Sequence, residues 1–305
     1  MEVVVNGGDR ADEEHAVKLS IIIVNFNGKH FFDACLRSLV EHVPFEHEVI
    51  VVDNASTDGS VDYLRRAYPE IRLIKSNSNL GFAGGNNLAA SYAKGDFLLL
   101  LNNDTILLND ITTALVLMER DVSIGILGAR MLGENGEYRH STGYFPEPWR
   151  LVRLSWLYRK DNGFGDGVFP KNDAKQYVDW VEGSFLLTPA SLWREIGGLD
   201  ESYFMYIEDI DYAKRVVDSG KQVVFFSGVS YKHFGGYGQS RVGMLYDGFR
   251  RFHRAHSSWP KRMLVNITLD VGLLVRAFVY MLRSIADKQE RERAVLCIKA
   301  LRRQR

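Results

Sequence analysis

Cysteine is scarce in this sequence, in which Cys35 and Cys297 are the only two among 305 residues. They lie far apart in segments of helical pattern, so the spacing of a disulfide framework or of a zinc site is absent. A net charge is also absent, because 38 Lys and Arg residues balance 38 Asp and Glu residues. The chain therefore has no global field that would attract nucleic acid, and we expect no nucleic-acid partner.

A signal peptide is not evident either. Residues 1–18 are polar and acidic and lack the basic start and apolar stretch of such a peptide, so we expect a disordered leader. Because no export signal is evident, we expect the protein in a cytosol, where both cysteine thiols are reduced. Internal repeats and low-complexity segments are likewise missing. The charge is uneven, however, because residues 250–305 hold fourteen Lys and Arg against four Asp and Glu, a net charge of +10. This asymmetry predicts a basic tail that acts on an acidic surface.

Strand and helix patterns alternate in the first hundred residues. Apolar, β-branched runs predict strands at 19–24, 48–52, 71–74 and 97–101, with helices between them. Such alternation implies right-handed crossovers and a doubly wound, mostly parallel sheet with flanking helices. The pattern weakens over 131–176. It then resumes as strands at 178–180, 184–187, 222–226 and 229–231 and helices at 189–196 and 207–219.

Polar residues follow each of the first four strands. They are Asn25 and Asn27, then Asp53 and Asn54, then Asn77 and Asn79, then Asn102, Asn103 and Asp104. In a doubly wound sheet the ligand lies beyond the carboxyl ends of the strands. A carboxylate or amide at every strand end suits a polar, phosphate-bearing ligand.

Two of these strand ends suggest specific chemistry. The Asp53 carboxylate can accept a hydrogen bond from the imide N–H of uracil or thymine, or it can form an Asx turn between strand and helix. Asp104 can bind a Mg²⁺ or Mn²⁺ ion that neutralises a diphosphate, or it can belong to a polar turn before the next helix. His233, beside glycines in YKHFGGYGQS, is a second ligand for that ion or a structural histidine.

Carboxylates also open the helix predicted at 207–219. Glu208 and Asp209 lie in its first turn, where a carboxylate can take the proton from an attacking hydroxyl group, or can simply be first-turn acidic enrichment. The loop LGFAGGNN, which contains Gly81 and Asn86, does not have the G-x-G-x-x-G spacing of a dinucleotide-binding loop. Glycines that open a helix still offer free N–H groups to an anion.

Taken together, six motifs resemble those of the inverting family 2 glycosyltransferases of GT-A fold, and more closely a rhamnosyltransferase-like subset. They are IIIVNFNG, VVDNASTDGS, NLGFAGGNN, LLLLNNDT, VEGSFLLTPASLWREIGGLDESYFMYIEDIDYAKR and KHFGGYGQS. The resemblance runs from about residue 19 to about residue 240 and rests on the order of the motifs as well as on each of them.

The resemblance implies roles for individual residues. Asp209 would be the catalytic base, and Asp104 and His233 would bind a divalent metal, Mg²⁺ or Mn²⁺. Asn102 replaces the first carboxylate of the family's DxD element, which would lower the affinity for the metal or make it depend more on His233 and the phosphates. Trp180, Glu182 and Glu208 would contact the acceptor. The donor-binding set would be Asn25, Asn27, Asp53, Asn54, Asn79, Gly81, Asn86, Asn103 and Asp104.

The tail from residue 250 lies outside this resemblance. Residues 263–282 are apolar enough to suggest a membrane span, but Asp270 and Arg276 lie inside that stretch and would each cost about 2.5–3.5 kcal/mol at a bilayer centre. On a helix, Leu264, Ile267, Val271, Leu274, Val275, Phe278 and Leu282 share one face. This amphipathic helical extension either lies on an anionic inner membrane or packs on the core or in a homodimer.

These observations predict a leader at 1–18, a GT-A domain at 19–249 and a basic helical extension at 250–305. The domain would divide into a nucleotide-binding half at 19–128 and an acceptor half at 129–249. The expected function is metal-dependent, inverting transfer of a hexose from UDP or dTDP to a saccharide or lipid-linked hydroxyl, with rhamnose as a candidate sugar. The alternatives are a sugar-nucleotide pyrophosphorylase, for which NFNGKH is a poor phosphate loop, and a non-catalytic nucleotide-sugar-binding scaffold.

Overall fold

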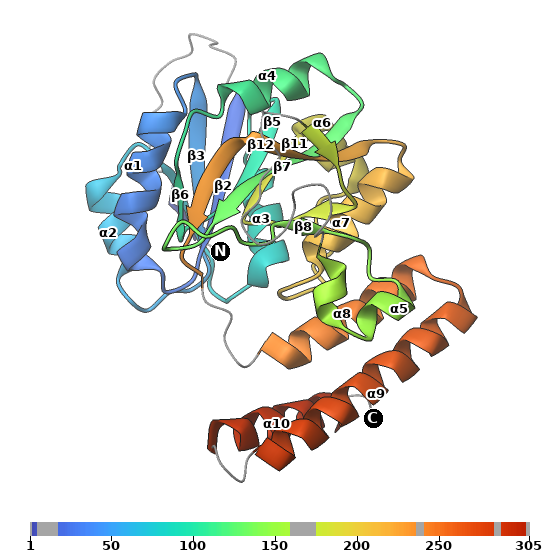
Figure 1. Cartoon of the computed structure of the whole chain (residues 1–305). Helices are drawn as coiled ribbons and strands as arrows, with labels where there is room; N and C mark the ends of the chain where they lie inside the picture. The colour runs from blue at the N-terminus through green and yellow to red at the C-terminus, as the bar shows by residue number, and fades with distance from the viewer. Residues whose placement is uncertain (1, 5–17, 159–174, 236–240, 284–287, 303–305) are drawn as a thin grey trace. The chain divides into compact units, whose positions relative to one another are not determined.

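A computed structural model describes residues 2–4, 18–158, 175–235, 241–283 and 288–302 of the chain (Figure 1). The chain divides into two compact units. The first comprises Met1–Gly143, Arg159–Phe204 and Asp209–Gly235, and the second Tyr144–Tyr158, Met205–Glu208 and Gly236–Arg305. The boundary predicted at residue 250 lies within a continuous helix, α8 (Arg241–His256), all of which belongs to the second unit.

Four parallel strands form one half of the sheet in the first unit. They are β2 (Leu19–Asn25), β3 (His47–Asp53), β4 (Arg72–Lys75) and β5 (Phe97–Asn102), in the order β4-β3-β2-β5. All four were predicted from their apolar runs. Asn25 pairs with Asp53 and Val24 pairs with Asn102, so the carboxyl ends of these strands are aligned at one edge of the sheet.

The other half of the sheet is mixed. Strand β11 (Phe185–Pro189) runs antiparallel between β5 and β7 (Ile124–Leu132), and β12 (Gln222–His233) runs parallel to β7. The segments predicted as two strands at 222–226 and 229–231 are one strand, β12, with a register shift between Phe226 and Ser230. The α/β fold class is thus confirmed, although antiparallel strands make the sheet less parallel than predicted.

Short strands complete the pairing. Strand β6 (Thr105–Leu107) and β9 (Lys175–Tyr177) pair antiparallel with β12, and β8 (Thr142–Gly143) pairs with β10 (Trp180–Val181). Within the predicted leader, β1 (Glu2–Val4) pairs antiparallel with β4. Residues 5–17 lie outside the described residues, so the disorder of the leader stays a prediction.

Helices lie on both faces of this sheet (Figure 1). They are α1 (Phe32–His42), which follows the short helix η1 (Lys29–Phe31), α2 (Ser60–Ala67), α3 (Gly81–Ala90), α4 (Thr112–Arg120), α6 (Ala190–Ile196) and α7 (Glu208–Asp218). Ile21 and Ile23 of β2 join a core cluster with Phe32 of α1, whereas Val24 faces Gly85 of α3. Because side chains alternate along a strand, α1 and α3 cover opposite faces.

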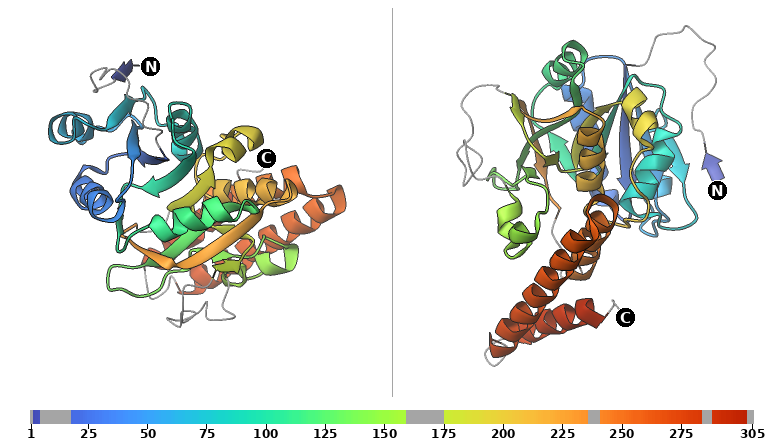
Figure 2. Two further views of the ribbon diagram at one scale, coloured as in Figure 1. Left: turned by 90° about the horizontal axis from the view of Figure 1, so that it is seen from above. Right: turned by 90° about the vertical axis from the view of Figure 1, so that its right-hand side faces the viewer.

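The second unit is helical. It contains α5 (Pro148–Leu151), η2 (Leu154–Leu157), α8, α9 (Trp259–Arg283) and α10 (Lys288–Arg302). Figure 2 shows α9 and α10 side by side. The buried residues of α9 recur every four positions at Val265, Leu269, Leu273 and Ala277. This spacing places them on one face, and the predicted helix at 263–282 is confirmed.

Candidate functional site

Asn25 joins three strand ends at the carboxyl edge of the sheet. Its side chain is fully buried, and Nδ2 donates to Asp53 Oδ1 at 2.8 Å and to Ser56 Oγ at 3.0 Å. Its Oδ1 accepts from Gly28 N at 3.1 Å and from Asn103 Nδ2 at 2.7 Å. These four bonds use the full hydrogen-bonding capacity of the amide. In this structure Asn25 therefore connects the ends of β2, β3 and β5.

Asp53 forms the Asx turn that the sequence offered as one of two interpretations. The second carboxylate oxygen accepts from Ser56 N at 2.9 Å, and the residue is fully buried. Its neighbour Asn54 donates from Nδ2 to Gly81 O at 2.9 Å, and its Oδ1 is buried without a hydrogen-bond partner within the described part of the chain. The predicted contact of Asp53 with a nucleobase stays a prediction.

The remaining donor-binding candidates also make contacts within the chain. Asn27, in the left-handed region with a φ of 55°, accepts from Thr57 N at 2.8 Å. Asn79 Oδ1 accepts from Gly81 N at 2.9 Å, and Asn86 Nδ2 donates to Phe82 O at 2.8 Å. The bonds of Asn79 and Asn86 lie at the start of α3, and the bond of Asn27 joins the loops that follow β2 and β3. The role of these three residues in donor binding stays a prediction.

Gly81 has a packing role that the motif alone does not reveal. Its φ is +73°, and a Cβ atom there would lie 2.2 Å from Phe204 O. We expect Gly81→Ala to lower the free energy of unfolding by about 3 kcal/mol, from left-handed strain plus overpacking. Gly136→Ala is the matched control, because its φ is +79° with nothing within 4 Å of the added Cβ. Urea unfolding of both variants measures the difference, and equal losses would show that the contact with Phe204 contributes nothing.

Asp104 and His233 are brought together by strand pairing. Thr105 of β6 pairs with His233 of β12, and Phe234 N donates to Asp104 O at 3.0 Å. His233 Nε2 consequently lies 3.2 Å from Asp104 Oδ1 and 3.3 Å from Asn102 Nδ2. The structure thus joins two residues that the sequence separates by more than a hundred positions.

The electrostatics of this pair raise the pKa of the imidazole. Burial of His233 opposes the protonated form, but the hydrogen bond and negative charge of Asp104 outweigh it, so the pKa of His233 is raised above its ordinary value. Metal ligation requires the neutral imidazole, so a raised pKa of His233 opposes ligation.

The pair fits a hard divalent cation. A Cβ atom at Gly235 would lie 2.8 Å from both Asp104 Oδ2 and His233 Nε2, so the glycine leaves this side of the pair open. No cluster of three or more His, Cys, Asp or Glu side chains suitable for a metal is found among the described residues. Two protein ligands are nevertheless enough for Mg²⁺-like ions, which commonly take one or two carboxylates and complete their coordination with water and substrate phosphates.

Arg139 holds the backbone on both sides of Phe234, next to the Asp104–His233 pair. The sequence did not predict this role. One guanidinium nitrogen, NH1, donates to His233 O at 3.2 Å and to Gly235 O at 3.0 Å. Arg139 lies in the stretch 131–176, where the sequence pattern is weak and no motif marks it. Its role arises only from tertiary contacts with the end of β12.

Asp209 lies at the same edge of the sheet as Asp104. Asp209 Oδ2 accepts a hydrogen bond from Gly183 N at 3.1 Å. The residue after Gly183 is Ser184, whose carbonyl accepts from Asn102 N at 3.2 Å. Phe185, at the start of β11, pairs with Leu101, near the carboxyl end of β5. Asp104 therefore follows the carboxyl end of β5 directly, and Asp209 of α7 is hydrogen-bonded to Gly183, beside that same end.

The backbone immediately before Asp209 is strained. Tyr206 and Ile207 both have φ values of 73°, a left-handed conformation that is unusual for a β-branched residue. Such strain costs about 1–3 kcal/mol per residue and is concentrated at functional sites. Glu208, which follows, is buried and belongs to the second unit.

The other two acceptor candidates lie in the first unit. Trp180 is buried in β10, and its carbonyl accepts from Thr142 Oγ1 at 2.5 Å. Glu182 is bonded through its backbone N to Ser141 O at 2.9 Å, and its Oε2 accepts from Ser184 Oγ at 3.5 Å. Glu182 is thus near Gly183, the residue that holds Asp209. Its contact with an acceptor stays a prediction.

Comparison with known proteins finds glycosyltransferases that are similar to this chain. The model of glycosyl transferase family 2 matches residues 20–169. The chain is 27% identical to the low-salt glycan biosynthesis hexosyltransferase Agl10 of Haloferax volcanii, over 65% of this chain and 61% of that protein. It is 25% identical to the N-acetylglucosaminyl-diphospho-decaprenol L-rhamnosyltransferase of Mycobacterium tuberculosis, over 70% of this chain and 75% of that protein. Rhamnosyltransferase WbbL of Escherichia coli is 26% identical, over 70% and 83%.

Solved structures show the same fold. The mannosyltransferase PcManGT of Pyrobaculum calidifontis, in complex with GDP-Man and Mn²⁺, has a TM-score of 0.57 at 16% identity and covers 96% of this chain and 90% of that one. TarS of S. aureus in complex with UDP has a TM-score of 0.53 at 16% identity, over 83% and 71%. The fold is that of the GT-A glycosyltransferases. The match to the family 2 model over residues 20–169 and the similarity to two rhamnosyltransferases support a family 2, rhamnosyltransferase-like chain.

Proposed function

We propose that this chain is a metal-dependent, inverting hexosyltransferase that moves a sugar from a nucleotide diphosphate to a hydroxyl group of a saccharide or lipid-linked acceptor. The proposed donor is a UDP or dTDP sugar and the proposed sugar is rhamnose, since two of the relatives described above are rhamnosyltransferases. The cation is Mg²⁺ or Mn²⁺. The enzyme would act in cell-surface glycan synthesis, in the cytoplasm and at the inner face of the plasma membrane.

One observation carries this proposal: the carboxylates of Asp104 and Asp209 and the imidazole of His233 are grouped at the carboxyl edge of one sheet. A divalent cation bound by Asp104 and His233 would neutralise the charge of the leaving diphosphate. The Asp209 carboxylate would accept the proton of the acceptor hydroxyl while the oxygen of that hydroxyl attacks the anomeric carbon. A single displacement of this kind inverts that carbon and needs one base, in contrast to the carboxylate pair of a retaining hydrolase.

Gly183 gives Asp209 its orientation. Because Gly183 N donates to Asp209 Oδ2 and Ile210 N donates to Asp209 Oδ1, both oxygens are fixed by the backbone. A retained base separates this proposal from the alternative of a non-catalytic scaffold, and no observation favours a pyrophosphorylase.

A thermal-shift panel with UDP, dTDP and GDP, each with and without Mn²⁺, tests the proposal. A ligand that binds only the folded chain must raise its melting temperature. We expect UDP or dTDP to stabilise the protein, and to do so more strongly with Mn²⁺. If no nucleotide changes the melting temperature under either condition, the donor proposal fails.

Arg139 provides a further prediction. Replacement by Met removes both bonds from NH1 to the segment that carries His233, so we expect metal-supported nucleotide affinity to fall about tenfold. Calorimetric titration of UDP and dTDP in the presence of Mn²⁺ measures this affinity. Arg120→Met, at an exposed position at the end of α4, removes the same charge without these contacts. Equal affinity in the Arg139 variant and in this control would contradict the supporting role.

A further inference from the structure

The second unit exposes an apolar surface along α9. Six large side chains follow one another on one face of the helix and are each about half exposed. We call them the α9 stripe: Leu264, Ile267, Val271, Leu274, Phe278 and Leu282. At about 100° per residue they fall within an arc of about 80°, opposite the buried face of Val265, Leu269, Leu273 and Ala277. Both faces of α9 are therefore apolar, and only one of them is covered within the second unit.

The polar residues of α9 are used inside the second unit. Asp270 Oδ1 accepts from Arg250 NH2 of α8 at 2.8 Å, and Asn266 Oδ1 accepts from Arg250 NH1 at 3.2 Å. Arg276 donates to the hydroxyl of Tyr246, also on α8. The charges that interrupt the apolar sequence thus point toward α8, and the α9 stripe itself contains none.

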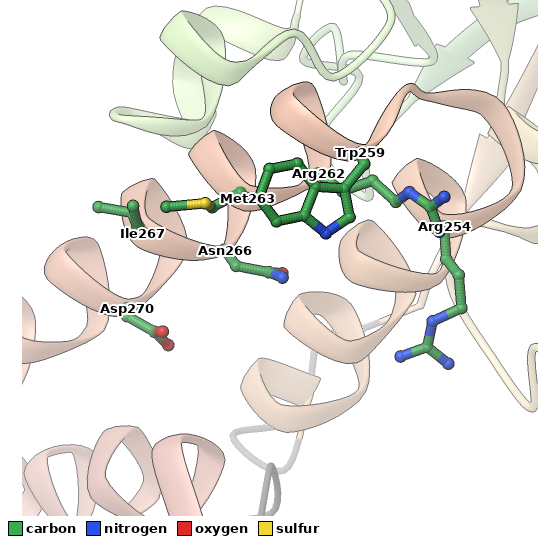
Figure 3. A pocket seen from close by; sticks show the side chains of 7 residues that line it. All are labelled: Arg254, Trp259, Arg262, Met263, Asn266, Ile267 and Asp270. Atoms are coloured by element: carbon green, nitrogen blue, oxygen red, sulfur yellow. The ribbon is translucent and has the colours of Figure 1, made fainter.

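Basic groups lie at one end of this surface. A hollow of about 400 Å³ is lined by Arg254 of α8 and by six residues of α9, namely Trp259, Arg262, Met263, Asn266, Ile267 and Asp270, whose carboxylate is paired with Arg250 (Figure 3). Trp259 is 70% exposed. An exposed tryptophan beside two guanidinium groups matches the interface of a membrane, where aromatic rings lie at headgroup depth and arginines meet phosphate.

We propose that the α9 stripe lies in the plane of an anionic lipid surface, and that the basic residues of 250–305, Arg254 and Arg262 among them, attract this surface electrostatically. The net charge of +10 over residues 250–305 complements such a surface. This inference deepens the location given in the proposed function and rests on it for the identity of the membrane. It does not rest on the chemistry of transfer.

The structure favours this orientation over a membrane span. By length and composition α9 is the one helix among the described residues that could cross a bilayer. If α9 crossed the bilayer, either every face of α9 would contact lipid or α8 and α10 would have to enter the bilayer together with α9. The neighbours are charged helices, since α8 contributes Arg250 to the pair with Asp270 and α10 carries Glu290 paired with Arg293. An in-plane helix buries only the face that α8 and α10 leave open.

Sedimentation with phosphatidylcholine vesicles, with and without phosphatidylglycerol, tests the inference on the full chain. We expect binding to the vesicles that contain phosphatidylglycerol. The double variant Leu274→Glu, Phe278→Glu should bind them at least about tenfold more weakly, because two large apolar side chains lose their burial. The matched control is Val40→Glu, Val122→Glu, which places the same charges at valines of the first unit that are 82% and 77% exposed.

A second variant tests the basic hollow. Replacing Arg254 and Arg262 by Gln should reduce the preference for phosphatidylglycerol about fivefold for each arginine. Failure of the wild-type chain to bind either vesicle would overturn the inference, as would equal losses in the stripe variant and the valine control. We expect light scattering without lipid to show that the wild-type chain is a monomer. A dimer that the stripe variant converts to monomer would show that a second copy of the chain covers this face.

Nucleotide-dependent thermal shifts separate this test from the proposed function. The stripe variant should keep the full shift of the wild type, because its substitutions lie in the second unit, whereas Asp104 and His233 belong to the first. Loss of vesicle binding with an intact shift supports the surface. An unchanged level of vesicle binding with an intact shift refutes the surface and leaves the donor site standing.

Discussion

Asp209→Asn is expected to keep nucleotide binding and to lose about 10²–10⁴-fold in the rate of sugar transfer, the usual contribution of a general base. An amide oxygen can still accept the hydrogen bond from Gly183 N, and the bond from Ile210 N to the other oxygen is lost, so we expect a small loss of stability and an unchanged donor site. An amide cannot, however, take up a proton at neutral pH. Steady-state release of the nucleotide with donor and acceptor present measures the rate, and calorimetry measures the affinity.

The control for this variant is Asp218→Asn, the same chemical change at an exposed position in the last turn of α7. It should have near-normal rates, since Asp218 pairs with Lys214 of the same helix on the surface. A near-normal rate in the Asp209 variant would remove Asp209 as the base. Loss of nucleotide binding in that variant would show that its main role is structural.

Asp104→Asn should abolish the part of nucleotide affinity that depends on the metal. We expect a loss of at least about 100-fold with Mn²⁺ and little change without it, because a neutral amide is a weaker ligand for a hard cation and does not balance its charge. Calorimetric titration of UDP and dTDP with Mn²⁺ and with a chelator gives both values.

Asp110→Asn is the matched control, because Asp110 lies six residues further along the chain, after β6, and accepts a hydrogen bond from Thr112 N. It should titrate like the wild type. If the Asp104 variant retains the difference between Mn²⁺ and chelator, the cation is bound elsewhere and the role proposed for Asp104 is wrong.

Local sequence patterns were enough to predict the first half of the sheet. The runs that became β2, β3, β4 and β5 are apolar because each strand is covered on both faces, and that pattern can be detected in the sequence. The meeting of Asp104 and His233 was predicted from the family resemblance, and β6 and β12 provide it through one ladder. Strand β7 was missed, because it lies where turn signals are scarce and glycines interrupt the pattern.

Other features depend on contacts that no local pattern encodes. Asn25 was assigned to the donor, yet its four hydrogen bonds are made to residues at the ends of other strands and in its own turn. Arg139 contacts a segment almost a hundred residues away. The antiparallel direction of β11 follows from its place between β5 and β7, which alternation of strand and helix cannot reveal.

The tail illustrates the same limit. The sequence correctly grouped the apolar face of α9 and left open whether it packs on protein or on lipid. The structure shows that a second face, Val265 to Ala277 at every fourth residue, is the one that packs, and that Arg250 neutralises Asp270. Such pairing between two helices is a tertiary property and could not be predicted from the periodicity of one of them.

Anomalous diffraction from crystals grown with Mn²⁺ and UDP or dTDP would locate the cation directly. The proposed mechanism predicts a single strong manganese peak within bonding distance of Asp104 and of His233 Nε2, with oxygens of both phosphates as further ligands and Asp209 facing the same nucleotide. A nucleotide bound at this sheet edge with no manganese at that pair, or manganese bound at another site, would contradict it.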